Sequence, residues 1–173
     1  GAAEASPDLP IGTPLGGFSS RCKALGSTSK IDNRDSAYAL SFMRSAGVHT
    51  RPQVKVVWLE VGGEHLVLIK SDTIYSFDGL VQTISEMLEA ETGLDLDGRV
   101  VMSSSHTHNG PANFSDQIHF YLGGDKFNPE NFQRYAKIAT DTALEAYAEL
   151  RPAAIGQAWQ KDWDPNDRVY RDR

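Results

Sequence analysis

Apolar residues recur along the chain with two different periods, and the shorter period predicts strands. Residues 53–61 and 64–69 are rich in Val, Leu and Ile and flank the pair Gly62-Gly63. Two β-rich runs joined by a Gly-Gly turn are typical of a β-hairpin. Three other short runs have the alternation or the apolar content of strands, and they lie at residues 36–43, 99–105 and 153–159.

Two longer segments follow the helical period. Residues 77–91 carry apolar side chains on one stripe and are followed by Gly93, which favours the end of a helix. Asn128 and Pro129 are typical of a helix N-cap and first turn, and the stripe that follows them continues to about residue 150. The order β, hairpin, α, β, α, β predicts an α/β fold in which helices cover a sheet.

The first 35 residues show no sustained period, and they contain Gly12, Gly16, Gly17 and Gly26 among Ser, Pro and Thr. They are therefore expected to form an extended segment, residues 1–35, that packs on an α/β portion comprising residues 36–173. The small and polar start of the chain is typical of a protein from which a signal peptide has been removed. We therefore expect a secreted or periplasmic location.

Composition limits the classes of function. The chain has 173 residues, 40% of them hydrophobic and 23% charged, which is typical of one globular domain. Lys plus Arg number 17 against 23 Asp plus Glu, so the net charge of −6 argues against a nucleic-acid partner. Cys22 is the single cysteine, which excludes an intrachain disulfide and a thiolate metal cluster.

The candidate chemistry lies in His106-Thr107-His108, directly after a predicted strand. Residues i and i+2 of an extended chain point to the same side, so both imidazoles can aim at one point, and imidazole nitrogen is a good zinc ligand. A catalytic zinc needs about three protein ligands, so two histidines do not complete a site. The alternative is that one or both histidines are ordinary polar residues in the turn that Asn109-Gly110-Pro111 predicts.

Other polar residues also admit two interpretations. Asp72 ends an apolar strand, where it either caps a helix or orients a zinc-bound histidine. His49, His65 and His119 have no ligand spacing to another histidine, so structural or exposed positions are expected for them. Cys22 is expected to be an inert small apolar residue.

Four segments, in the same order along the chain, resemble the neutral (alkaline, non-lysosomal) ceramidase family. Residues 9–18 (Leu-Pro-Ile-Gly-Thr-Pro-Leu-Gly-Gly-Phe) are similar to the opening Pro-x-Gly-x-Pro-(Met/Leu)-x-Gly-Tyr of that family. Residues 66–72 are similar to its apolar strand ending in Ser-x-Asp, and residues 150–156 to its Leu-x-Pro-Ala-x-Ile. Residues 102–111 match Ser-x-x-His-Thr-His-Ser-Gly-Pro most specifically, with Asn109 in place of the Ser.

The resemblance implies a zinc-dependent amidase that cleaves an N-acyl bond, of a ceramide-like lipid or another acylated amine, with a metal-activated water. It implies that His106 is a Zn²⁺ ligand and that His108 lies beside the metal and contacts the scissile amide or its oxyanion. Arg168 corresponds weakly to an active-site arginine of the family, because Asp167 interrupts the usual Asn-Arg pair, and Arg171 is its rival.

Family members are several hundred residues longer, so the resemblance implies that this chain is the N-terminal portion of a larger zinc-hydrolase domain. The remaining zinc ligands would then come from a downstream chain of the same precursor, retained after proteolytic processing, unless the sequence is a truncated piece. We expect residues 1–173 not to fold by themselves, because the sheet would lack strands and leave an apolar face uncovered. The alternative function is a non-catalytic binding or assembly subunit that keeps the fold.

Overall fold

Four strands form one mixed sheet in the computed structural model, which describes residues 1–17, 22, 36–161 and 164–166. They are β1 (Ala2–Ala5), β2 (Val54–Val61), β3 (Glu64–Ser71) and β4 (Val100–Ser104), and their spatial order is β1-β2-β3-β4. The first two pairings are antiparallel, and β3 pairs with β4 in parallel. The parallel pair is joined by a helix, as such a crossover requires, and its two carboxyl ends therefore lie side by side.

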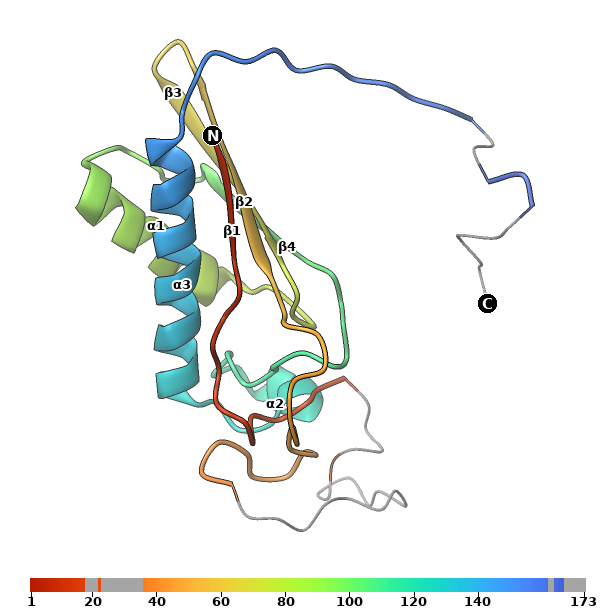
Figure 1. The fold of residues 1–173 in the computed structure, drawn as a ribbon. Coiled ribbons are helices and arrows are strands. Elements are labelled where there is room, and N and C mark those ends of the chain that lie inside the picture. The colour runs from red at the N-terminus through yellow and green to blue at the C-terminus, as the bar shows by residue number, and fades with distance from the viewer. Residues whose placement is uncertain (18–21, 23–35, 162–163, 167–173) are drawn as a thin grey trace.

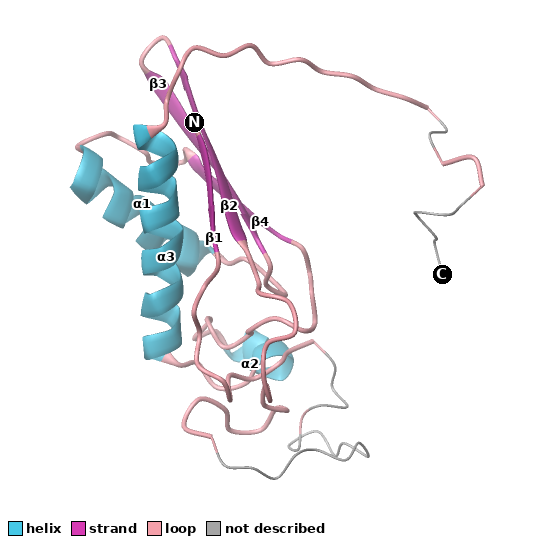
Figure 2. Cartoon of the chain, viewed as in Figure 1, coloured by secondary structure: helices cyan, strands magenta, loops and turns pink. Residues whose placement is uncertain are grey.

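Two long helices cover one face of this sheet, as Figures 1 and 2 show. Helix α1 (Asp78–Thr92) ends at Gly93, whose φ of 69° is the left-handed conformation that glycine adopts readily. Helix α3 (Pro129–Ala148) begins after Asn128, whose side chain accepts a hydrogen bond from the Asn131 amide. The short helix α2 (Ile118–Gly124) lies near the end of the sheet where β3 and β4 finish (Figure 1).

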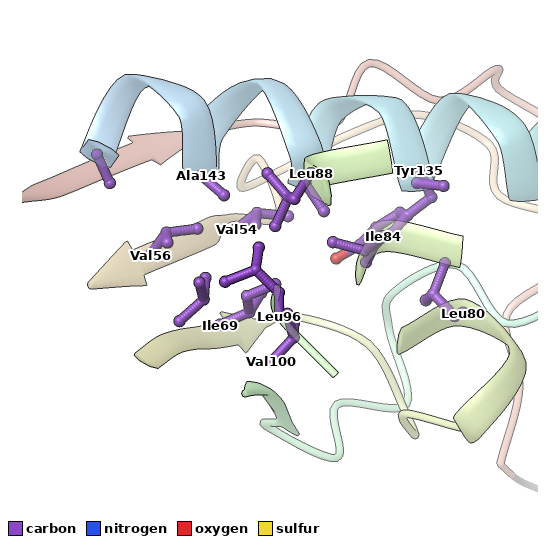
Figure 3. Packing of buried hydrophobic residues seen from close by; sticks show 14 of the residues in the cluster. Val54, Val56, Ile69, Leu80, Ile84, Leu88, Leu96, Val100, Tyr135 and Ala143 are labelled. Carbon is purple, nitrogen blue, oxygen red and sulfur yellow. The ribbon is translucent and has the colours of Figure 1, made fainter. Parts of the chain in front are cut away.

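The hydrophobic core lies between the sheet and the helices α1 and α3. Alternate residues of β2 and β3 are buried, while their neighbours along each strand are mostly exposed. Figure 3 shows the sheet side chains facing apolar side chains of the two helices. The largest fully buried side chains include Trp58, Tyr135, Ile69, Leu80, Ile84, Leu88 and Leu96. No helix in the described part of the chain is long and apolar enough to cross a membrane.

The opposite face of the sheet, which we call the open face, is not covered by α1 or α3. A row of aligned residues crosses all four strands on it: Ala2 pairs with Val57, Val57 with Leu68, and Leu68 with Val101. The three large side chains of this row are 37–50% exposed. Large contiguous apolar patches on soluble proteins often mark interaction sites, so this row is a candidate for one.

The structure confirms most of the predicted elements. The hairpin around Gly62-Gly63, the strand after residue 99 and both long helices form at the predicted places, and the α/β class is confirmed. The sequence pattern missed β1 and α2. The assignment of residues 1–35 and 36–173 to two portions stays a prediction.

Two predicted strands were wrong. The amides of Leu40, Ser41 and Phe42 donate to the carboxylate of Asp125 instead of to a neighbouring strand. Residues 153–159 are exposed and run away from the body of the protein (Figure 1), with Trp159 at 81% exposure. A strand needs a partner for its backbone groups, and within the described residues neither segment belongs to the sheet.

Candidate functional site

The loop that carries the two histidines begins where the parallel pair β3 and β4 ends. Ser71 and Ser104 are the last paired residues of these strands, and the Ser105 amide continues the ladder by donating to the Ser71 carbonyl at 2.9 Å. Carboxyl ends of parallel strands are the usual position of sites in α/β sheets. Sheet pairing therefore brings the His106-Thr107-His108 loop next to residues 72–75, which follow β3.

His106 is held by the segment after β3. Its Nδ1 lies 2.7 Å from the carbonyl oxygen of Ile74. A carbonyl can only accept, so the ring donates from Nδ1, and in the neutral ring the lone pair is then on Nε2. His106 is exposed, and this arrangement, with one nitrogen fixed and the other available, is the one that metal-bound histidines adopt.

His108 lies beside His106 for a reason other than strand alternation. The backbone of His106 has a φ of 57°, in the left-handed region, so the two histidines are not on one extended segment. Their rings nevertheless meet edge to face, with centroids 5.0 Å apart and an interplanar angle of 74°. The predicted proximity of the two imidazoles is confirmed, whereas its predicted geometric cause was wrong.

The N-terminal segment contributes Gly17 to the site. Its φ is 91°, and a Cβ built on it would lie 2.4 Å from Nδ1 of His108 and 2.5 Å from Cδ1 of Ile74. The Gly17 amide donates to the Gly123 carbonyl at the end of α2, at 2.7 Å. Only glycine fits here, because a side chain would occupy the position of the His108 ring. The pair Gly16-Gly17 is the feature of the sequence that indicates a close approach of the backbone at this point.

Of the two interpretations that the sequence left open for Asp72, the helix cap is wrong, and the orientation of a zinc-bound histidine stays a prediction. Helix α1 begins six residues later and Phe77 is its N-cap, so Asp72 caps no helix. Its carboxylate accepts from the Gln53 amide at 3.0 Å and pairs with Lys70. Partial burial raises the pKa of Asp72, but the hydrogen bonds from Lys70, Gln53 and Ser105 outweigh it, so the net pKa is lowered. The His106 ring is oriented by the Ile74 carbonyl.

A cavity of about 660 Å³ lies beside the same loop. Thr107 and Asn109 line it together with Asp72, apolar residues of the N-terminal segment and the loop of residues 45–52. His106 and His108 are not among the lining residues. The cavity is therefore adjacent to the histidine loop without opening on the two rings.

The described part of the chain holds no complete metal site. Within those residues, no group of three or more His, Cys, Asp or Glu side chains is placed to hold a metal ion. His106 fits one ligand position, because its Nε2 is available and its Nδ1 is fixed. The two arginines predicted from the resemblance, Arg168 and Arg171, lie outside the described residues.

The remaining candidates have structural or exposed positions. His65 accepts a hydrogen bond from the indole of Trp58 at 3.1 Å, and His49 and His119 are exposed. Cys22 is fully buried and forms a β-bridge with Phe42, which agrees with the inert apolar role.

Asn113 begins an Asn-Phe-Ser triplet, the pattern of an N-glycosylation acceptor. It is fully buried and donates from its amide nitrogen to the Tyr38 carbonyl at 2.9 Å. In the folded chain this side chain is therefore part of the packing.

The chain was compared with family models, with curated proteins and with solved structures. No family model matches the chain. Neutral ceramidase B of Dictyostelium discoideum is 24% identical over 132 residues, and neutral ceramidase A of the same organism is 24% identical over 140 residues. A crystal structure of neutral ceramidase from Pseudomonas aeruginosa superposes with a TM-score of 0.66 at 21% identity, over 88% of this chain. The chain is similar to neutral ceramidases in sequence and in fold.

A second ceramidase structure, described as complexed with C2, superposes with a TM-score of 0.63 at 20% identity. The resemblance to neutral ceramidases predicted from the four motifs is thus confirmed. The match covers 75% and 77% of this chain but only 18% and 20% of the two Dictyostelium ceramidases. It likewise covers 22% of the Pseudomonas ceramidase chain. The chain therefore spans about one-fifth of the length of the ceramidases that it resembles.

Proposed function

We propose that the protein hydrolyses an N-acyl amide bond, of a ceramide-like lipid or another acylated amine, and that the His106-Thr107-His108 loop is this chain's contribution to the active site. The observation that carries the proposal is the pair of imidazoles at the carboxyl ends of β3 and β4, one of them fixed through Nδ1 by Ile74. The similarity to neutral ceramidases gives this pair its chemical context.

Each residue has a definite task in the proposal. His106 would bind Zn²⁺ through Nε2, and the bound metal would supply Lewis-acid polarisation of the scissile carbonyl. His108, whose ring contacts that of His106 edge to face, would hydrogen-bond the amide or the developing oxyanion. By the resemblance to the ceramidases, Arg168, with Arg171 as its rival, would be an active-site arginine.

We further propose that another polypeptide segment completes the site and covers the open face. It would correspond to the part of the ceramidases that this chain does not span, and would be a downstream chain of the same precursor that brings the remaining zinc ligands. Two observations support it: the described residues hold fewer than three clustered ligands, and Val57, Leu68 and Val101 form an exposed apolar row. Secretion after removal of a signal peptide remains part of this proposal.

The test uses the complete assembly and a fluorogenic N-acyl amide as substrate. Elemental analysis should find one zinc per assembly, and His106→Ala should abolish both zinc binding and hydrolysis. His108→Ala should retain most of the zinc and lose about 10²- to 10³-fold in kcat, the effect of removing an oxyanion contact. His119→Ala replaces an exposed histidine that does not belong to the His106-Thr107-His108 loop, so it is the matched control and should behave as the wild type.

Two results would contradict these assignments. Equal zinc loss in the His106 and His108 variants would show that the roles are wrongly divided. An assembly that has never met a chelator and yet contains no transition metal would favour the second candidate, a non-catalytic binding or assembly subunit. The observation behind that candidate is the incomplete ligand set of the described residues.

A further inference from the structure

Four hydroxyl groups form a continuous chain beneath the histidine loop. The Tyr135 hydroxyl, on α3, contacts Ser71 Oγ at the end of β3, and Ser71 Oγ lies 2.8 Å from Thr73 Oγ1. Thr73 Oγ1 in turn lies 3.0 Å from Ser104 Oγ at the end of β4. Tyr135, Ser71 and Thr73 are at most 1% exposed. Buried hydroxyls of this kind are costly to leave without partners.

The direction of each hydrogen bond among these four hydroxyl groups follows from one acceptor. Thr73 Oγ1 lies 3.1 Å from the carbonyl oxygen of Tyr75, and a carbonyl only accepts, so Thr73 donates its single proton there. The Thr73 oxygen must then accept from Ser71 and from Ser104, and Ser71 must accept from Tyr135. Burial raises the pKa of the Tyr135 phenol, which agrees with its role as a permanent donor. Thr73 uses its full capacity of one donated and two accepted bonds.

This fully bonded threonine is next to the peptide that orients His106. Ile74, whose carbonyl accepts from His106 Nδ1 at 2.7 Å, lies between Thr73 and Tyr75, the two ends of the donated bond. On the other strand, Ser104 is two residues before His106. The Thr73 hydroxyl therefore ties together both segments that determine where the His106 ring lies.

We propose that Thr73 is a positioning residue for His106: through its three hydrogen bonds it fixes the Ile74 carbonyl, and the carbonyl fixes the Nδ1-protonated tautomer of the ring. The metal-binding consequence of this inference rests on the proposed function, whereas the tautomer itself does not. A network that only stabilised the fold would leave the tautomer of His106 unchanged whenever the protein is folded.

The test is ¹⁵N NMR of the histidine side chains in the complete, chelator-treated protein, with the His106 signals assigned from a His106→Gln variant. Wild type should show proton attachment at Nδ1. Thr73→Val keeps the shape and removes the hydroxyl, so it should give a mixture of tautomers and weaken zinc binding about 10- to 100-fold, as the loss of an orienting partner does. Thr73→Ser should restore both properties.

Thr83→Val is the matched control, because the Thr83 hydroxyl bonds only within α1, to the Gly79 carbonyl at 2.8 Å, and it should change neither property. A folded Thr73→Val protein with the wild-type tautomer and zinc affinity would overturn the inference. If Thr73→Val does not fold, Ser104→Ala removes one donor of the network and should shift the tautomer in the same direction, and unchanged signals would overturn the inference. If no variant, including wild type, binds zinc while the tautomer responds as expected, the proposed function fails and the inference stands.

Discussion

Gly17 and His108 lie in direct contact, although 91 positions of the sequence separate them. A Cβ on Gly17 would come within 2.4 Å of one ring nitrogen of His108, and the φ of 91° at Gly17 disfavours any other residue. The N-terminal segment thus forms one wall of the histidine site. We expect the position of His108 to depend on this glycine.

Gly17→Ala should move the His108 ring and, if the proposed function holds, lower the rate of amide hydrolysis by about 10²-fold, since displacements of about 1 Å at a site have effects of that size. The control is Gly156→Ala, because a Cβ there meets no atom within 4 Å and the backbone has no positive φ. Steady-state kinetics of both variants checks the prediction. A Gly17→Ala enzyme with wild-type kcat would show that His108 is not positioned by this contact.

The Asp125 carboxylate accepts the backbone hydrogen bonds that residues 40–42 would make to a neighbouring strand if they were part of a sheet. This buried carboxylate accepts from the amides of Leu40, Ser41 and Phe42 at 2.8–3.0 Å. In Asp125→Asn the amide nitrogen would face these donors, so we expect the free energy of unfolding to fall by about 3 kcal/mol. Urea denaturation of this variant measures the effect, and Asp116→Asn, which replaces an exposed aspartate, is the control. Equal urea midpoints for the two variants would contradict the prediction.

The lowered pKa of Asp72 predicts a pH dependence of stability. Its carboxylate is favoured in the folded chain by Lys70 and Gln53, so its pKa lies below the ordinary value of 3.8. The contribution of Asp72 is therefore fully present above the unfolded-state pKa and is lost as the pH falls through the lowered folded-state pKa. Thermal melts of wild type and Asp72→Asn should differ by a constant amount near neutral pH and converge below about pH 4.

Asp97→Asn serves as the charge-matched control for that comparison, since Asp97 is exposed. Its melting temperature should follow that of wild type at every pH. If the Asp72→Asn curve also runs parallel to wild type down to about pH 2, the folded chain does not favour the Asp72 carboxylate.

The open face predicts how residues 1–173 behave without a covering partner. The exposed row of Val57, Leu68 and Val101 should make the isolated chain self-associate or bind hydrophobic dyes. Leu68→Lys should reduce that association, whereas Leu122→Lys, on the exposed surface of α2, should not. Size-exclusion chromatography with light scattering distinguishes these outcomes, and a wild-type chain that is monomeric and melts cooperatively would contradict the prediction.

Elements with local signals could be predicted before the structure was known. The hairpin follows from two β-rich runs around Gly62-Gly63, and the start of α3 from Asn128 and Pro129, because turn and cap preferences act over a few residues. The His-Thr-His motif also placed the two imidazoles together, since residues two apart cannot lie far from one another. The similarity to neutral ceramidases could also be predicted from short motifs, because each motif is a local run of residues.

Contacts between residues that are far apart along the chain became visible only in the folded protein. Residues 36–43 have the alternation of a strand, yet the Asp125 carboxylate, more than 80 positions later, takes three of their amides. The parallel pairing of β3 with β4 brings the His106 ring to the Ile74 carbonyl and Ser104 to the Thr73 hydroxyl. A local pattern cannot specify these contacts, because a backbone or side-chain donor bonds to whichever acceptor the packed chain brings within reach.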